Sequence, residues 1–477
     1  MSVYKDFLRL LDFSEDETEH ILPDWEQACK SLGLNESDVR FATDEWLPKH
    51  WDLSLHGVRM CIGAYVRELI ELSKLSEYKA RGDKILYCSM PSHPACVYAN
   101  KISGGDRLHI SFPDYLLTTV LSAFFHKHTV LADGDTPCMN PLCGHCGMNS
   151  LHADARYKGL IVEPTVVWNW GLYCNEGPKT DEMMDGISGS HWNYVLSTIP
   201  KDYDSSIPEA EDLMRVNYLK LQLKEGQRVV SMHTGIQVSD DDVLTAERQY
   251  MTYINKVEEL TDLVCCSDPQ PITGNDLTIF NAPMSISFNS GFKYLIEAVD
   301  LVIEEVKRRI DLGQGALPKG APRLACQFVP FCVPWVSRTF LDNGINLSIN
   351  TFLAPASSQK KYYDEGDIYK TIAQQWFTIP SAVHMLDEAR LIEEILRKYP
   401  VDGVLFGFFS FDRWVGTLEK TLIRIVEERT GIPHYYLEGE FWDDDRYSLA
   451  DRLTRIQNIA YTVKINHMMN GAGYAKK

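Results

Sequence analysis

The sequence predicts an α/β protein with two doubly wound, parallel-sheet lobes that face each other across a cleft, with N-terminal and central helical segments. Short apolar runs, each as long as a buried strand, alternate with helical stretches along most of the chain. A loop rich in Gly and Pro, GQGALPKGAPR, separates two such series of similar size. We therefore expect a helical segment at 1–80, a first lobe at 81–215, a second helical segment at 216–320 and a second lobe at 321–477.

The first part of the chain is expected to be helical and then to form a sheet. Before residue 80, the stretch IGAYVRELIELSKL places apolar residues three and four positions apart, as an amphipathic helix does. Beyond it, four apolar runs separated by turn residues have the length of buried strands. They are KILYCSM, KHTVLADG, YKGLIVEPTVV and NYVLSTIP.

Long helices and a second series of strands are expected next. Amphipathic patterns predict helices at about 240–264 and 292–312. After the Gly- and Pro-rich loop, strands are predicted at RLACQFVPF, NLSINTFL, VDGVLFGFF and PHYYLEGE, and helices at 386–398, 418–429 and 449–462. The turn TGIP is expected to end a helix at its glycine and to lead into the next strand.

Composition excludes several classes of protein. The 477 residues are 45% hydrophobic and 24% charged, the balance of a soluble globular chain with a sizeable core. A net charge of -19 without a basic stripe argues against a nucleic-acid partner. No apolar stretch is long enough to span a bilayer and no secretory signal opens the sequence. We expect a cytoplasmic protein without membrane contact, whose twelve cysteines are thiols or metal ligands.

Four cysteines form the strongest candidate site. They are Cys138, Cys143, Cys146 and, after a gap of 27 residues, Cys174. The first three lie on DGDTPCMNPLCGHCGMNS, which lacks apolar periodicity, so they are not all packing residues. Thiolates suit an iron–sulfur cluster or a zinc ion, and the spacing does not choose between them. Four buried thiols without a metal are the alternative. His145 and His152 are substitute ligands if Cys174 lies elsewhere.

The position of these cysteines fits a ligand site of an open α/β sheet. Such sheets bind ligands beyond the carboxyl ends of their strands, where the strand order reverses. The cysteine loop follows KHTVLADG and Cys174 follows GLIVEPTVVWNW, so both are expected at strand ends. The sequence contains no GxGxxG, P-loop, HExxH or GxSxG motif, so nucleotide phosphates are not indicated.

The segment VDGVLFGFFSFDRWVGTLEKTLIRIVEERTGIPHYYLEGEFWDDDRYSLADRLTRIQNI, at 401–459, resembles the last strand–helix–strand–helix segment of the 2-hydroxyacyl-CoA dehydratase and benzoyl-CoA reductase family. Weaker likeness covers CGMNS at Cys146, LYCNEGPKT at Leu172 and FCVPWVSRTFLDNGINL at Phe331, so that the resemblance touches most of 85–465. It implies two α/β lobes with a four-iron four-sulfur cluster between them, a homologous second subunit in a hetero-oligomer, and an acyl-CoA thioester as substrate.

The family pattern is altered at the predicted metal site. The resemblance implies three cluster-ligating cysteines, one in each motif, with one iron left open to the substrate. Cys146 matches the first position, but Pro178 stands at the second and Asp412 at the third. The other three thiols lie outside this pattern, so we expect a rebuilt site with four ligands from one lobe. Such a saturated site would be structural or purely electron-transferring. Asp412 stays a catalytic candidate that can reach a metal through oxygen, and a helix N-cap is its alternative role.

Further candidates lie in two segments. YCSMPSHPACVYANK stands where the family's catalytic subunits carry a Ser and a Glu near the substrate hydroxyl, which makes Ser92, His93 and Cys96 catalytic candidates, with Cys96 near the Glu position. His93 can act as acid or base and Cys96 as nucleophile or ligand, and a structural role is the alternative for each. Glu176 and Lys179 stand where a helix N-terminus can bind the anionic thioester tail, although a solvated loop explains them equally well.

Three functions are compatible with these features. The chain can be an enzyme subunit, a lyase or an oxidoreductase, that acts on a 2-hydroxyacyl-CoA or aryl-CoA thioester through low-potential iron–sulfur chemistry. It can instead be a non-catalytic partner that keeps the fold and a saturated metal site. A third possibility is a zinc-containing subunit for non-redox thioester chemistry. The element bound by the thiols distinguishes iron–sulfur chemistry from the zinc alternatives.

Overall fold

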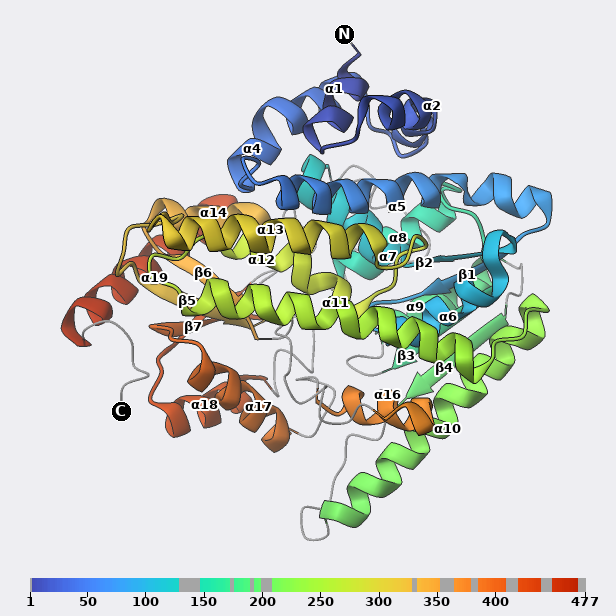
Figure 1. The fold of residues 1–477 in the computed structure, drawn as a ribbon. Coiled ribbons are helices and arrows are strands. Elements are labelled where there is room, and N and C mark those ends of the chain that lie inside the picture. The colour runs from blue at the N-terminus through green and yellow to red at the C-terminus, as the bar shows by residue number, and fades with distance from the viewer. Residues whose placement is uncertain are drawn as a thin grey trace.

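The computed structural model describes residues 2–127, 146–171, 176–188, 193–198, 208–327, 333–351, 364–378, 385–408, 419–438 and 448–470. Within them it contains two four-stranded sheets whose paired strands are all parallel, covered by many helices (Figure 1). The predicted α/β class with two parallel-sheet lobes is therefore confirmed. One continuous cluster of buried apolar side chains, from Val3 to Val463, runs through both lobes.

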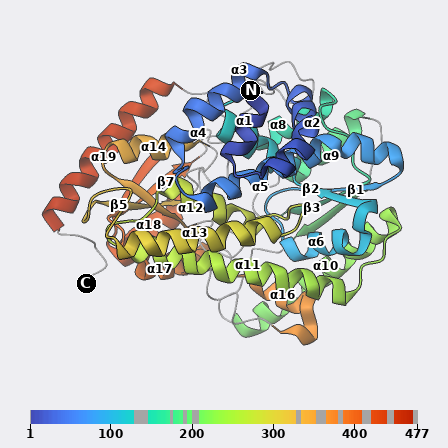
Figure 2. The same cartoon turned by 45° about the horizontal axis from the view of Figure 1, so that its top comes forward.

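The first part of the chain is helical, as its periodicity predicts. Its helices are α1 (Val3–Leu10), α2 (Glu15–Ser31), α3 (Glu36–Phe41), α4 (Leu47–His50) and α5 (His56–Arg81), with a π-helical stretch at Ala42–Trp46. Ser14 caps α2 by accepting a hydrogen bond from the Glu17 amide, and α5 ends at Gly82, whose φ of 98° suits glycine. Figure 2 shows α1 to α4 lying over α5.

The first sheet has the strand order β2-β1-β3-β4. Its strands are β1 (Lys84–Cys88), β2 (Leu108–Ser111), β3 (Val166–Gly171) and β4 (Asn193–Thr198). Its helices are α6 (Pro94–Gly104), α7 (Pro113–Leu116), α8 (Gly147–Tyr157) and α9 (Glu176–Ser188), with a π-helical stretch at Leu117–Phe124.

Two details of this sheet differ from the sequence prediction. The prediction missed β2, because His109 and Ser111 interrupt its apolar pattern although all four residues are buried. β3 begins only at the last two residues of the predicted run YKGLIVEPTVV, because the run contains a turn at Gly159 with φ of 68° and Pro164, a residue without a backbone donor. The predicted strand KHTVLADG lies outside the described residues from 128 onward.

The second sheet has the order β6-β5-β7-β8, which repeats the topology of the first. Its strands are β5 (Arg323–Gln327), β6 (Asn346–Asn350), β7 (Gly403–Phe408) and β8 (His434–Glu438). The helices of this part of the chain are α14 (Pro334–Asp342), α16 (Ile368–Trp376), α17 (Met385–Lys398), α18 (Glu419–Thr430) and α19 (Leu449–Asn470), of which α16 packs against the first lobe. All four predicted strands are confirmed, and so is the turn after α18, where Gly431 has a φ of 69°.

Four further helices connect the two sheets. They are α10 (Pro208–Thr234), α11 (Asp240–Cys266), α12 (Gly274–Asn281) and α13 (Lys293–Asp311). Figure 1 shows α11 and α13 running across both sheets beside α5. Near the start of α11, Asp242 accepts a hydrogen bond of 2.9 Å from Ser103 on α6. At its end, the Cys265 carbonyl accepts one of 2.8 Å from Arg323 on β5.

In each sheet the first strand is central, the second lies on one side of it and the third on the other. The winding therefore reverses between β1 and β3 and between β5 and β7, and such switch points are where doubly wound sheets bind ligands. The segments that follow every strand except β1 and β2 fall outside the described residues. The cleft between the lobes therefore stays a prediction.

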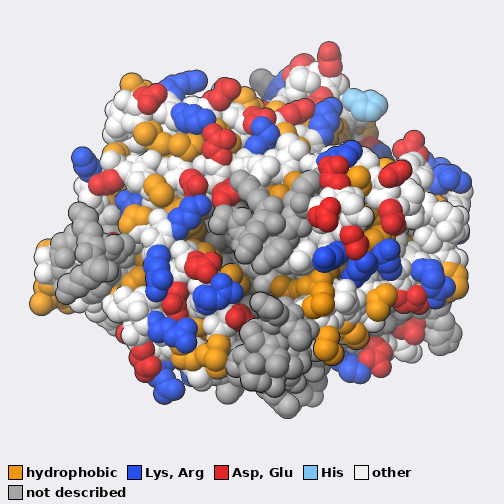
Figure 3. All heavy atoms as spheres, turned by 60° about the horizontal axis from the view of Figure 1, so that its bottom comes forward, with side chains coloured by type: hydrophobic (Ala, Val, Ile, Leu, Met, Phe, Trp, Pro, Cys, Tyr) orange, Lys and Arg blue, Asp and Glu red, His pale blue; other side chains and the backbone are white. Residues whose placement is uncertain are grey.

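The described surface mixes both signs of charge. On the face in Figure 3, Lys and Arg side chains alternate with Asp and Glu, so its described residues form no continuous basic stripe. Among the helices that the structure describes, none combines the length and the apolar character needed to cross a membrane.

Candidate functional site

Three predicted catalytic residues lie together at the carboxyl end of the central strand of the first sheet. β1 ends at Cys88 and α6 begins at Pro94, so Ser92 and His93 lie on the connecting loop and Cys96 lies in the first turn of α6. The Ser92 amide donates a hydrogen bond of 2.9 Å to the Ser285 carbonyl, which fixes the loop. All three side chains are buried. They therefore lie at the switch point between β1 and β3.

His93 is held by two side chains that the sequence analysis did not identify. Its Nε2 atom lies 3.1 Å from Oε1 of Gln375 on α16, and Nε2 of Gln375 donates a hydrogen bond of 2.8 Å to Oε1 of Glu247 on α11. Burial lowers the pKa of His93 to about 4 and raises the pKa of Glu247 to about 7. At neutral pH, His93 is therefore an uncharged imidazole.

Cys96 has the chemistry of a packing residue in this environment. Burial, and to a lesser degree the charge of Glu247, raises the pKa of the Cys96 thiol well above its usual value. Nucleophilic attack and metal ligation both require the thiolate form, which burial disfavours. The described surroundings thus favour the structural alternative for Cys96, whereas His93 keeps the properties of a hydrogen-bonding base.

An aromatic wall lies beside His93. Trp376 has its ring centroid 6.4 Å from that of His93 and stacks on Trp170 of β3 at 5.5 Å, and Trp170 stacks on Trp168 at 5.2 Å. Trp168 donates a hydrogen bond of 2.9 Å from Nε1 to Ser197 on β4. The Nε1 atoms of Trp170 and Trp376 are buried and have no hydrogen-bond partner among the described residues. Burial of His93 beside the Trp376 ring removes it from water, and this burial is the main cause of its lowered pKa.

The one predicted metal ligand within the described residues is Cys146, which is half-buried and directly precedes α8. The first turns of α8 and α9 meet, because a Cβ atom at Gly177 would lie 3.7 Å from Oδ1 of Asn149. Further along the helices, Nη1 of Arg156 donates a hydrogen bond of 2.8 Å to Oδ1 of Asp181, and both side chains are fully buried. Cys146 is therefore placed next to the N-terminus of α9.

The other predicted site residues have varied positions. Cys138, Cys143, Cys174 and Asp412 lie outside the described residues. Glu176 is the first residue of α9, and Lys179 is exposed in its first turn, where it forms an ion pair of 2.5 Å with Glu182. Within the described part of the chain, no three His, Cys, Asp or Glu side chains are arranged to hold a metal ion. The metal site therefore remains a prediction.

His152 and Asp114 are two further polar residues near the carboxyl ends of strands of the first sheet. His152, the substitute ligand, is buried inside α8 with its ring 6.4 Å from that of Tyr87 on β1, so it packs against the sheet. Asp114 follows β2 and accepts hydrogen bonds from the backbone amides of Met90, at 3.3 Å, and Tyr115, at 2.8 Å. Asp114 thus links the end of β2 to the loop that carries Ser92 and His93.

Replacement of Asp114 by Asn should change how stability depends on pH. Burial raises the pKa of Asp114 from 3.8 to about 7, so the folded protein keeps a proton that the unfolded chain loses. The retained proton stabilises the folded protein. This contribution is complete below about pH 4 and is lost as the pH rises through 7. Relative to Asp114→Asn, the natural protein should therefore lose about 2 kcal/mol between pH 5 and pH 8. Thermal unfolding at several pH values measures this difference.

The matched control is Asp16→Asn, which changes an exposed carboxylate in the first turn of α2. Its stability difference from the natural protein should be nearly constant over the same pH range. If the stability of Asp114→Asn and that of the natural protein depended on pH in the same way, Asp114 would be ionised in both the folded and the unfolded state.

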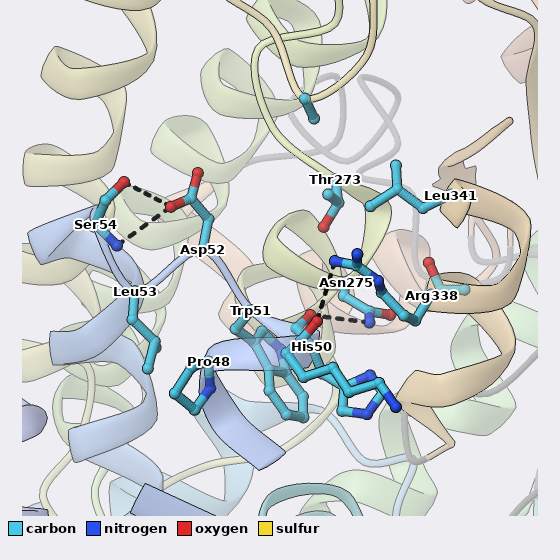
Figure 4. Close-up of a pocket in the computed structure, with 13 residues that line it drawn as sticks. Pro48, His50, Trp51, Asp52, Leu53, Ser54, Thr273, Asn275, Arg338 and Leu341 are labelled. Carbon is cyan, nitrogen blue, oxygen red and sulfur yellow. Dashed lines mark hydrogen bonds between the residues drawn. The ribbon is translucent and has the colours of Figure 1, made fainter. Parts of the chain in front are cut away.

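A separate cavity of about 420 Å³ lies where the N-terminal helices meet the second lobe (Figure 4). Arg338 on α14 donates a hydrogen bond of 3.2 Å to the Lys49 carbonyl. Asn275 on α12 donates bonds to the carbonyls of His50, at 3.2 Å, and Pro334, at 3.1 Å. These polar groups join α4 to α12 and α14, so the cavity belongs to a structural junction and contains none of the predicted site residues.

The two sheets of identical strand order define a protein of the doubly wound α/β class with two lobes, and comparison with known proteins identifies its family. A family model described as 2-hydroxyglutaryl-CoA dehydratase, D-component, matches residues 165–459, which is more than half of the chain. The chain belongs to this family. The resemblance found in the sequence is therefore confirmed.

Two relatives are similar over parts of the chain. A benzoyl-CoA reductase subunit of Thauera aromatica is 24% identical over 303 residues, which cover 59% of this chain and 66% of the relative. The alpha subunit of lactoyl-CoA dehydratase of Anaerotignum propionicum is 24% identical over 200 residues, covering 42% of this chain and 47% of the relative. The chain thus spans less than two thirds of the length of either relative.

Proposed function

We propose that this chain is a subunit of a complex related to 2-hydroxyacyl-CoA dehydratases and aryl-CoA reductases, that it acts on an acyl-CoA thioester, and that it holds a cysteine-ligated metal centre. Family membership over residues 165–459 supports the first part. The names of both relatives describe subunits and refer to CoA thioesters, which supports a homologous second subunit and a thioester substrate.

The contact between the first turns of α8 and α9 is the observation that carries the metal centre. Cys146 directly precedes α8, and Cys174 lies two residues before α9 in the sequence. The contact of Asn149 with Gly177 supports a centre to which the segments before α8 and before α9 both contribute ligands. We therefore assign Cys138, Cys143, Cys146 and Cys174 as ligands of one centre. Two helix N-termini favour a negative charge nearby, which a metal with four thiolates carries.

Each residue has a defined role in this proposal. The four thiolates would hold either a four-iron four-sulfur cluster, which would transfer a low-potential electron, or a zinc ion, which four thiolates would saturate and make structural. His93 is an uncharged base beside an aromatic wall at the same edge of the sheet. Ser92 is a buried hydroxyl on the same loop, and its Oγ atom has no partner among the described residues. Both suit a hydrogen-bonding role toward an acyl group.

A second candidate function is that of a supporting subunit. Pro178 stands in the first turn of α9, where the family pattern implies a cysteine, and a proline offers no ligand atom. A centre saturated by four cysteines leaves no open metal position for a substrate. Such a subunit would keep the fold and the metal while an active homologue performs the chemistry.

Metal analysis of anaerobically purified protein is the direct test. A brown protein with roughly four irons per chain would support the iron–sulfur proposal, and one colourless zinc per chain would support the zinc alternative. Substitution of Cys143 by Ser should remove most of the metal, because a hydroxyl is a poor ligand for either centre. Inductively coupled plasma analysis measures the occupancy.

The matched control is Cys266→Ser, which changes an exposed cysteine at the end of α11 and should leave the metal content unchanged. Full occupancy in Cys143→Ser would contradict the ligand assignment. A natural protein without any bound metal would contradict the proposed centre altogether.

A further inference from the structure

We propose that Glu247 and Gln375 are positioning residues that hold His93 in the tautomer with its proton on Nε2, and thereby leave Nδ1 as a buried acceptor for a hydroxyl or another donor group of the ligand. The inference deepens the proposed function, because the ligand of Nδ1 is the proposed acyl group. The geometry of the three side chains carries it independently of the metal centre.

The first step is the orientation of the Gln375 amide. Oε1 of Glu247 lies 2.8 Å from Nε2 of Gln375, and a carboxylate oxygen only accepts hydrogen bonds. The sulfur of Met251, a weak acceptor, lies 3.6 Å from the same nitrogen. Oε2 of Glu247 is buried without a partner among the described residues, so a proton taken up by Glu247 can sit on Oε2 and leave Oε1 as an acceptor. In either state the Gln375 nitrogen faces Glu247.

The second step is the tautomer of His93. With its nitrogen turned to Glu247, Gln375 presents Oε1 to Nε2 of His93 at 3.1 Å. An amide oxygen only accepts, so Nε2 must carry a hydrogen. A neutral imidazole has a single N–H group, and burial keeps His93 neutral by lowering its pKa to about 4. Nδ1 is therefore left with its lone pair.

The third step is the state of Nδ1. This atom is buried and has no hydrogen-bond partner among the described residues. A buried polar atom without a partner is energetically unfavourable, and a bound donor group would satisfy it. His93 lies directly before α6 at the carboxyl end of β1, the edge at which this class of sheet binds ligands.

The fourth step concerns the surrounding charges. The rings of Tyr250 on α11 and Trp376 on α16 pack against His93, and Cys96 on α6 lies within reach of the charge of Glu247. Burial raises the pKa of both Cys96 and Tyr369, a further titratable side chain of α16, so both stay neutral near pH 7. Hydrogen bonds, rather than an ion pair, therefore set the proton position on His93.

Nitrogen NMR of the full-length protein with ¹⁵N-labelled histidine tests the proposal without a substrate or a metal. The His93 signals are assigned by their loss in His93→Gln. At pH 7 we expect a protonated Nε2 and an unprotonated Nδ1 in the natural protein. Observation of the proton on Nδ1, or of a doubly protonated ring at this pH, would overturn the proposal.

Two variants test the role of the Gln375 contact. Gln375→Glu places a carboxylate next to Nε2, so the pKa of His93 should rise by one unit or more, because a nearby negative charge favours the imidazolium. Met251→Leu is the matched control, since it removes only the weak sulfur acceptor and should leave the titration of His93 unchanged. If folded Gln375→Glu left the pKa of His93 unchanged, the contact between Gln375 and His93 would be wrong. A protein without bound metal would contradict the proposed function, but it would not contradict the tautomer proposed for His93.

Discussion

Replacement of Gly274 by Ala should destabilise the protein by about 4 kcal/mol or more. Gly274 begins α12, and a Cβ atom there would lie 1.6 Å from the carbonyl oxygen of Leu347 on β6. The obstacle is backbone, which no side-chain rotation can move. The Gly274 amide also donates a hydrogen bond of 3.1 Å to Asn346, so a displaced helix would lose that bond as well. Thermal unfolding and the yield of soluble protein measure the effect.

The control for this prediction is Gly186→Ala in α9. A Cβ atom at Gly186 would meet nothing within 4 Å, so alanine should be neutral or stabilise the helix by about 0.5–1 kcal/mol. If Gly274→Ala unfolded at the same temperature as Gly186→Ala, the close approach of α12 to β6 would be wrong.

Replacement of Asp181 by Ala should cost about 3 kcal/mol, because it removes the more deeply buried of the two carboxylates that lie 2.8 Å from the guanidinium of Arg156 and leaves only Glu163. Arg156 and Asp181 have side-chain exposures of 0% and 1%. Asp181 also accepts a hydrogen bond of 2.7 Å from Asn169 on β3, so three elements of the first lobe meet at this carboxylate. Denaturant unfolding measures the loss, and metal content should fall with it because the same pair holds α8 against α9.

The adjacent residue provides the control. Glu182→Ala removes the exposed partner of Lys179, and an ion pair at that exposure contributes at most about 1 kcal/mol. Equal stabilities for Asp181→Ala and Glu182→Ala would refute the buried ion pair. The stability of Asp181→Asn should lie between those of Asp181→Ala and Glu182→Ala, because asparagine keeps the hydrogen-bonding shape of the side chain but removes its charge.

Much of the fold was predictable because parallel strands are buried on both faces. A strand such as Gly403–Phe408 therefore appears in the sequence as a continuous apolar run. Helix ends were predictable where glycine adopts a positive φ, as at Gly431 after α18. The strand Leu108–Ser111 was missed because His109 is buried by contacts that no local pattern reveals, namely stacking on Tyr78 at 4.0 Å.

The candidate site was only partly predictable, for a different reason. Ser92 and His93 follow an apolar run directly, so their place at the end of a strand could be expected from sequence. Glu247 and Gln375 carry no local signal of function, and Gln375 is 282 positions away from His93 and 128 from Glu247. Only packing of α11 and α16 on the first lobe brings them together. The set of four cysteine ligands remains a prediction, for which the metal content is the test.

Helix α11 has a mechanical consequence for the molecule. Its 27 residues form a rod about 40 Å long, anchored at one end to α6 by Asp242 and at the other to β5 through the Cys265 carbonyl. Because each end of the helix is bonded to a different lobe, we expect the two sheets to resist hinge-like separation, which would break one of these hydrogen bonds.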